Sequence, residues 1–210
     1  MTVLDKLASS LHRRDEFPNQ ELAKQIANNG DKKAVKELIE NLGSKNKDVQ
    51  SDCIKVIYEI GVLQPKLVAG FSKELIALLD NKSNRLQWGA MTALNTIANE
   101  SPKAIYNALE KIIDVADKGS VITNDNCVAI LIKLCPTKEY AEEAFSLLNE
   151  RLKNCPTNQL PMYAENALPI INDKNKPTFV KTLQLRLSDI EKDTKRIRVE
   201  KVIKKLTAHK

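Results

Sequence analysis

Aromatic residues and glycines are scarce in this chain. Aromatics account for 4% of its 210 residues, and only six residues are glycine. β-Sandwiches and β-barrels need β-branched and aromatic runs joined by glycine-rich turns, which this composition does not supply. The sequence also contains no G-x-G-x-x-G motif and no long stretch in which apolar and polar residues alternate. These absences exclude the common sheet-based classes and predict an all-α chain.

Patterns that bind metals or activate nucleophiles are missing as well. The two histidines, His12 and His209, lie at opposite ends of the chain, and the four cysteines show no metal-ligand spacing. The sequence offers no cysteine–histidine pair for nucleophilic catalysis and no glycine-rich loop for phosphate binding. We therefore expect a non-enzymatic protein with no catalytic residue, no metal and no cofactor.

Long apolar runs are absent too. No stretch approaches the roughly 18 apolar residues that a membrane span requires. Residues 1–10 lack the charged start and the apolar block of a signal peptide. We therefore expect a soluble, cytoplasmic protein.

What the chain does contain is a repeat with a period of 37 residues. Four apolar positions spaced i, i+3, i+4 and i+7 lie on one stripe of a helix, and the same spacing recurs in four places, each time beginning with a small residue. Twelve further matches to one template have a chance probability of roughly 10⁻⁵ at this apolar content, so the repeat is real. The four sets are Cys53, Val56, Ile57 and Ile60; Ala90, Ala93, Leu94 and Ile97; Cys127, Ile130, Leu131 and Leu134; and Ala164, Ala167, Leu168 and Ile171.

Each repeat is predicted to be a pair of helices. One pair cannot bury apolar residues on both of its sides, so successive pairs must stack. We predict a single array over residues 1–210, with a degenerate N-terminal cap and repeat at 1–43, regular repeats at 44–191 and a basic capping helix at 192–210. The expected first helices are 48–61, 85–98, 125–134 and 163–171, and the expected second helices are 67–79, 105–116, 137–152 and 177–191.

Local signals predict several helix ends. A first short helix is expected at 3–11. The Asn29-Gly30 pair is expected to end the next helix in a left-handed conformation, and Asp31 to cap the one that follows. Ser101 and Thr137 are also placed to cap helices, whereas Pro169 should kink or end the helix that contains it.

The cysteines are interpreted as structural residues. Cys53 and Cys127 fill the repeat position that alanine fills elsewhere, which suits a small core residue. Two stacked repeats separate them by roughly 20 Å, too far for a disulfide. Cys135 and Cys155 each precede a proline at a helix end and could approach one another, but we expect them to be reduced.

Residues 48–61 and 85–98 resemble the first-helix consensus of HEAT and armadillo-type repeats. That consensus has an acidic, a β-branched and a basic residue, followed by alanine and an aliphatic pair; Gln50 and Gln87 replace the basic residue here. The resemblance covers roughly residues 44–191. It implies an all-α, right-handed superhelix, or solenoid, of about five helix pairs. It further implies a scaffold that binds a protein partner on a curved surface formed by the second helices.

Two residues are candidates for contact with a protein partner. Trp88 lies off the buried stripe of its helix, and Arg85 lies one turn before it. Tryptophan and arginine are the residue types most enriched at binding hot spots. Alternatively, a neighbouring repeat covers Trp88 and its role is structural.

The C-terminal segment carries the whole net charge of the chain. Residues 192–210 contain eight basic and two acidic residues, a net charge of +6. Lys195, Arg198, Lys201 and Lys205 form a row that suits phosphate groups, so the alternative function is nucleic-acid binding. HEAT-like DNA glycosylases resemble the chain in size and charge, but they use several tryptophans where this chain has one. A capping helix would also need a polar outer face, which leaves a purely structural role open.

Overall fold

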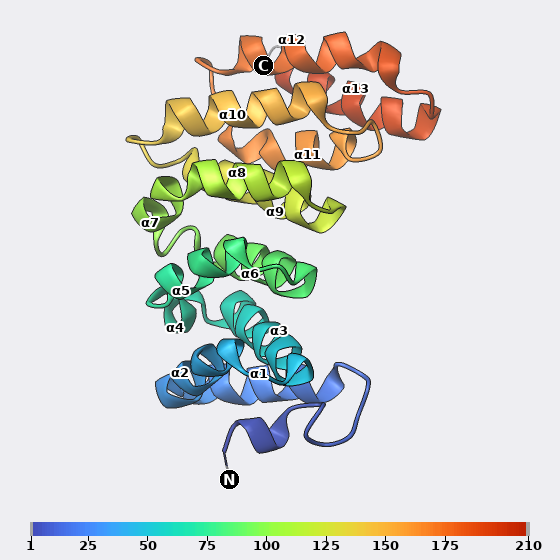
Figure 1. Cartoon of the computed structure of the whole chain (residues 1–210). Helices are drawn as coiled ribbons and strands as arrows, with labels where there is room; N and C mark the ends of the chain where they lie inside the picture. Colours follow the sequence, from blue (N-terminus) through green and yellow to red (C-terminus); the bar gives the residue numbers. More distant parts are fainter. Residues whose placement is uncertain (1, 209–210) are drawn as a thin grey trace. The chain divides into compact units, whose positions relative to one another are not determined.

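The computed structural model describes residues 2–208, and every regular element in that range is helical (Figure 1). The predicted all-α class is therefore confirmed. The chain divides into two compact units, Met1–Cys127 and Val128–Lys210, and helix α9 (Val121–Leu134) contains the boundary. None of the helices among the described residues has the length and apolar composition needed to cross a bilayer.

The first unit is built around α3 and α6. Helix α3 packs against α1, α2 and α6, and α6 packs in turn against α4 and α5. The second helices expected at 67–79 and 105–116 are each broken in two, the first of them beside Gly70, a poor helix former. The helices are α1 (Phe17–Asn29), α2 (Lys32–Glu40), α3 (Lys47–Leu63), α4 (Pro65–Ala69), α5 (Ser72–Ala77), α6 (Asn84–Ile97), α7 (Pro102–Asn107) and α8 (Leu109–Lys118).

The second unit contains four further helices after α9. They are α10 (Ala141–Asn154), α11 (Leu160–Ala167), α12 (Lys176–Arg186) and α13 (Asp193–Thr207). Helix α12 packs against α10, and α13 packs against both α11 and α12. Pro169 lies in a 3-10 turn that follows the end of α11, as its restricted backbone predicts.

The repeat forms the core of the chain. All twelve positions of its first three sets are 0% exposed. In the fourth set Ala164 and Ala167 are fully buried, but Leu168 and Ile171 are partly exposed because the helix ends before Pro169. The periodicity in the sequence therefore identifies the buried stripe of α3, α6 and α9, and two of its four positions in the fourth set.

Glycine is required where α3 and α6 meet. A Cβ atom at Gly89 would lie 2.6 Å from Cγ1 of Ile54, which is fully buried on α3. Such a separation is far below van der Waals contact, so a side chain at this position would displace Ile54 or move the two helices apart. The packing of α6 on Ile54 of α3 therefore depends on Gly89.

Three of the predicted cap positions are confirmed and one is wrong. Gly30 ends α1 with φ of 61°, and the Asp31 carboxylate accepts hydrogen bonds from the first amides of α2. Ser101 is the N-cap residue of α7, with Pro102 at the start of the helix, but its hydroxyl accepts no hydrogen bond from the helix amides and donates instead to the carbonyl of Ala69. Helix α10 begins only at Ala141, so Thr137 lies in the turn before it.

The helix expected at 3–11 is also wrong. The structure has a 3-10 turn at Leu4–Lys6, followed by irregular turns. The amide of Ala8 donates to Oδ1 of Asn19 at 3.0 Å, and the amide of Ser9 donates to Oδ2 of Asp52 at 2.7 Å. These side chains of α1 and α3 take the backbone donors that a helix would use internally.

Within the described residues no cysteine forms a disulfide. Cys53 and Cys127 are fully buried, as expected for small core residues. Burial raises the pKa of the Cys53 thiol to about 12, so this thiol is protonated at neutral pH.

Candidate partner-binding site

Arg85 and Trp88 contact one another on α6. The guanidinium carbon of Arg85 lies 4.3 Å from the centroid of the Trp88 ring, which is a cation–π geometry. Both residues are partly buried, and 31% of the Arg85 side chain is exposed. The tryptophan is therefore neither fully covered by a neighbouring repeat nor freely exposed.

Helix α3 extends this pair with a second aromatic residue and a second cation. The rings of Tyr58 and Trp88 lie 6.3 Å apart at an interplanar angle of 45°. The ammonium nitrogen of Lys55 lies 4.9 Å from the centroid of the Tyr58 ring. We call these four residues, Lys55, Tyr58, Arg85 and Trp88, the aromatic platform.

Two carboxylates neutralise the cations of the platform. Nζ of Lys55 lies 2.8 Å from Oε2 of Glu16 and 2.7 Å from Oε1 of Glu59. The other carboxylate oxygen of Glu16, Oε1, accepts a hydrogen bond from Nη2 of Arg85 at 3.2 Å. One carboxylate therefore bridges a lysine of α3 and an arginine of α6.

These ion pairs shift the pKa values of both partners. The hydrogen bond from Lys55 lowers the pKa of the Glu16 carboxyl below its ordinary value. Burial alone would lower the pKa of Lys55, but its hydrogen bonds to Glu16 and Glu59 outweigh burial and raise that pKa. Glu16 and Lys55 are therefore both charged at neutral pH.

A row of polar side chains continues from the platform along α6 to α9. The hydroxyl of Thr92 donates to the carbonyl of Trp88 at 2.8 Å. The amide of Asn126 donates to Oγ1 of Thr92 at 3.2 Å, and the amide of Asn95 donates to Oδ1 of Asn126 at 2.8 Å. All three side chains are partly exposed, so the platform and this row form one continuous polar and aromatic surface within the first unit.

A cavity of about 520 Å³ adjoins the platform. Arg85 and Glu16 line it together with residues of the N-terminal segment and of the start of α3. The cavity is therefore bounded by the carboxylate that bridges Lys55 and Arg85.

The basic row of α13 is only partly available to a ligand. Lys195 donates to the carbonyl and to Oδ1 of Asn158, and Arg198 pairs with both carboxylate oxygens of Glu165. Lys201 and Lys205 are exposed and have no hydrogen-bonding partner among residues 2–208. His209 and Lys210 lie outside the described residues.

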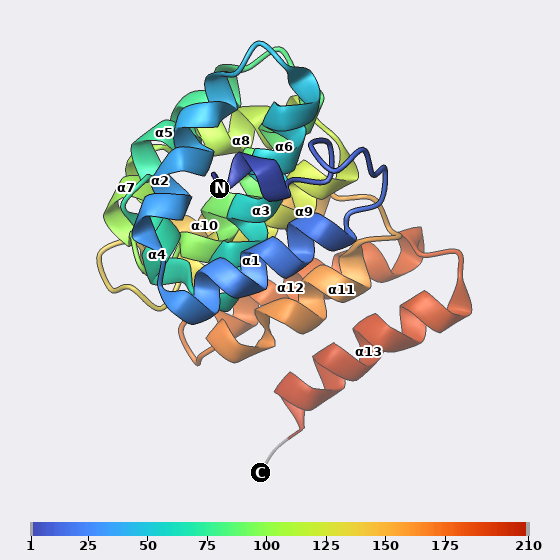
Figure 2. The same cartoon turned by 90° about the horizontal axis from the view of Figure 1, so that it is seen from below.

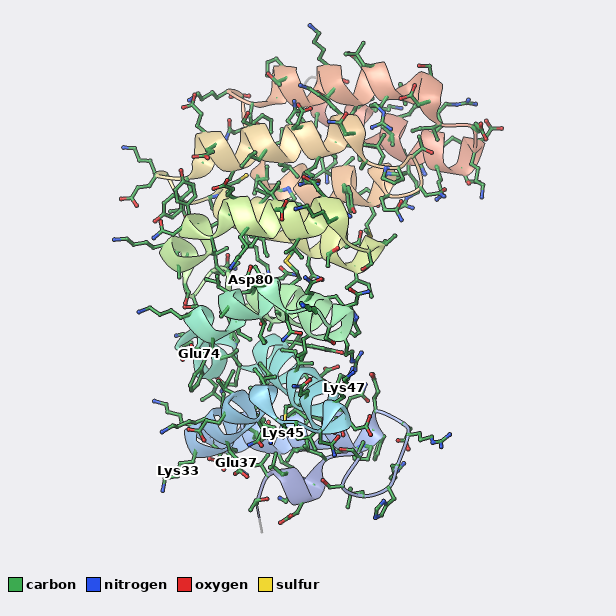
Figure 3. The ribbon with its side chains drawn as sticks, in the orientation of Figure 1. Lys33, Glu37, Lys45, Lys47, Glu74 and Asp80 are labelled. Atoms are coloured by element: carbon green, nitrogen blue, oxygen red, sulfur yellow. The ribbon has the colours of Figure 1, made fainter. Side chains whose placement is uncertain are left out.

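Charges of both signs occur near the second helices of the first unit. Figure 3 labels charged residues on α2, near the start of α3, on α5 and in the turn after α5. They are Lys33, Glu37, Lys45, Lys47, Glu74 and Asp80. Asp80 forms an ion pair with Lys111 at 2.5 Å. This part of the chain is of mixed charge and not a uniformly basic surface.

No three His, Cys, Asp or Glu side chains of residues 2–208 are grouped for metal binding.

Sequence comparison gives one informative match. No protein family model matches the sequence. The chain is 33% identical over 96 residues to an uncharacterized protein of Methanocaldococcus jannaschii, and the match covers 43% of this chain. It spans less than half, 46%, of that relative's length.

Solved structures give fuller coverage at low sequence identity. A designed armadillo repeat protein in complex with the peptide (KR)4 has a TM-score of 0.67 and 18% identity, over 90% of this chain and 87% of that one. Computationally designed armadillo repeat proteins for modular peptide recognition give a TM-score of 0.61 and 17% identity, with 98% of both chains covered. At this identity the likeness concerns the fold. Together with the repeat seen in the sequence, it shows that the chain has an α-solenoid fold of the HEAT/armadillo type.

Proposed function

We propose that this chain is a non-enzymatic module that binds a peptide or protein segment, and that Arg85 and Trp88 anchor the partner. The observation that carries the proposal is the partly exposed tryptophan held between Arg85 and Tyr58. A side chain fixed in this way loses little conformational entropy on binding. Designed proteins of the same fold include one in complex with a peptide, which supports the choice of partner class.

The anchor lies on a first helix of the repeat. Arg85 and Trp88 belong to α6, and Lys55 and Tyr58 belong to α3. The polar side chains of Thr92, Asn95 and Asn126, which are hydrogen-bonded to one another, continue the same surface. The proposed surface is therefore formed by the first helices, whereas the family resemblance alone suggested the second helices.

The test is selection from a random peptide library against the wild-type chain, with counter-selection against Trp88→Ala. Trp88 is the sole tryptophan of the chain, so its fluorescence reports directly on this surface. Selected peptides should change the emission saturably. Calorimetry should show affinity lowered about 30-fold by Trp88→Ala, since hot-spot truncations cost about 2 kcal/mol or more.

Leu185→Ala provides the matched control for that experiment. Leu185 is a large apolar side chain, 68% exposed, on α12 of the second unit. Its truncation should leave the affinity unchanged. If the selected peptides bind Trp88→Ala as tightly as they bind the wild-type chain, the binding surface lies elsewhere.

Nucleic-acid binding through α13 is the alternative, and the exposed Lys201 and Lys205 favour it. Against it, Lys195 and Arg198 are already bound to Asn158 and Glu165. We expect no tight binding when single- and double-stranded DNA and RNA are titrated at several salt concentrations. Binding that weakens steeply with salt and is lost in Lys201→Glu/Lys205→Glu would establish the alternative instead.

A further inference from the structure

The bridge formed by Glu16 has the geometry of an occupied carboxylate-binding site. Lys55 of α3 and Arg85 of α6 converge on one carboxylate, and each cation contacts a different oxygen atom. Such charge-assisted hydrogen bonds are the strongest that a carboxylate makes with side chains. The occupant, however, comes from the same chain.

Glu16 can leave this site without unfolding a helix. Its backbone carbonyl accepts a hydrogen bond from the amide of Gln20 and so belongs to the start of α1. Rotation of the side chain alone would release Lys55 and Arg85. The Glu16 side chain is 49% exposed, and Lys55 keeps the carboxylate of Glu59 when Glu16 leaves, so another carboxylate can take the place of Glu16.

The segment around Glu16 leaves the site accessible. Residues 10–17 are all exposed, and Figure 2 shows this part of the chain as a dark-blue loop that leads into α1. The other ion pair of the loop, between Arg13 and Asp15, is local. Among residues 10–16, Glu16 is the residue whose side chain forms ion pairs with α3 and α6.

The adjoining cavity adds a further cation. Arg14 lines the cavity, is exposed and has no ion-pair partner among the described residues. Of the acids that line it, Asp15 is paired with Arg13, and Asp52 accepts hydrogen bonds from Ser9 and Asn19. Asp48, also exposed, lies in the first turn of α3, where the helix dipole favours a negative charge.

We propose that Glu16 occupies the place of a partner's carboxylate, and that the segment bound at the aromatic platform is acidic. An aspartate or glutamate of the partner displaces Glu16 and binds Lys55 and Arg85, while neighbouring partner residues contact Trp88. Glu16 therefore competes with the partner, and the apparent affinity is the intrinsic affinity multiplied by the fraction of molecules in which Glu16 has left the site. This inference rests on the proposed peptide-binding function of the same surface.

The test uses Glu16→Gln and the peptide (DE)4, with (KR)4 and (GS)4 as charge controls. Trp88 emission is recorded during each titration, and circular dichroism verifies that every variant is folded. Glu16→Gln should bind (DE)4 about 10-fold more tightly than the wild type, because the competitor is weakened. Glu21→Gln removes an equal charge from the exposed surface of α1 and should change the affinity little. The double variant Glu16→Gln/Arg85→Gln should lose this increase in affinity for (DE)4.

The outcomes separate this inference from the proposed function. Suppose that library-selected peptides change Trp88 emission but Glu16→Gln leaves the affinity for (DE)4 unchanged or lower. Competition by Glu16 is then refuted, whereas the proposed peptide-binding surface is still supported. Competition by Glu16 is also refuted if Glu21→Gln raises the affinity for (DE)4 as much as Glu16→Gln does, or if Glu16→Gln raises the affinity for (KR)4 more than that for (DE)4. If no peptide of any charge or from the library perturbs Trp88 in either protein, the proposed function fails, and the inference fails with it.

Discussion

Ile57→Ala is expected to lower the free energy of unfolding by about 2–5 kcal/mol. Ile57 is 0% exposed and lies in the middle of α3, the helix that packs against α1, α2 and α6. Truncation removes buried apolar surface and leaves a cavity that neighbouring helices can fill only in part. Denaturant unfolding followed by circular dichroism measures the change.

Val62→Ala is the matched control for this prediction. Val62 lies on the same helix but is 66% exposed, so its truncation should change the unfolding free energy by no more than about 0.5 kcal/mol. Similar losses in the two variants would show that the repeat stripe of α3 is not a packed core.

Glu16→Gln and Glu59→Gln together are expected to destabilise the chain by more than the sum of the two single substitutions. Either single substitution leaves Lys55 with one carboxylate partner. The double substitution removes both partners, although the Lys55 side chain is only 7% exposed and its ammonium group is charged. Both carboxylates are partly exposed, so we expect an interaction energy of about 1–3 kcal/mol, below that of a fully buried pair. A double-mutant cycle of unfolding free energies measures it.

The same cycle in a Lys55→Met background supplies the control. Without the ammonium group there is no buried charge to compensate, so the two glutamine substitutions should become additive. An interaction energy that persists in Lys55→Met would mean that the two glutamates are coupled in some way other than through Lys55.

The contribution of these ion pairs should depend on pH in a defined direction. The pKa of Glu16 is lowered in the folded chain, so its stabilisation is complete above the ordinary value of 4.5 and is lost as the pH falls through the lowered pKa. The pKa of Lys55 is raised, so its stabilisation is complete below 10.5 and is lost only as the pH rises through the raised pKa. The stability difference between the wild type and the double variant should therefore be constant near neutrality and shrink in acid.

Local signals predicted the helices well because helix formation and capping depend on near neighbours. The stripe at Cys53, Val56, Ile57 and Ile60 and the left-handed Gly30 follow from spacing and residue type. The prediction of a helix at 3–11 was wrong because contacts with residues distant in sequence determine the conformation of this segment. Its amides bond to Asn19 and Asp52, and no periodicity in the sequence reports such contacts.

The same distinction applies to the candidate site. Arg85 and Trp88 lie one turn apart on a single helix, so their contact could be anticipated, and Lys55 and Glu59 are an i, i+4 pair that the sequence also displays. Glu16 could not be found in this way. It lies before α1, outside the repeat, and reaches Lys55 and Arg85 only because α1 and α6 both lie close to α3.

The absence of a side chain at Gly89 has a consequence for recognition. Gly89 follows Trp88 directly and lets α6 approach Ile54 of α3. This interhelical distance also sets the separation of Lys55 and Arg85, and therefore whether one carboxylate can reach both. A larger residue at position 89 would displace Ile54 or α6 without touching any ligand, so the ligand preference that we propose for the surface would be controlled in part from inside the core.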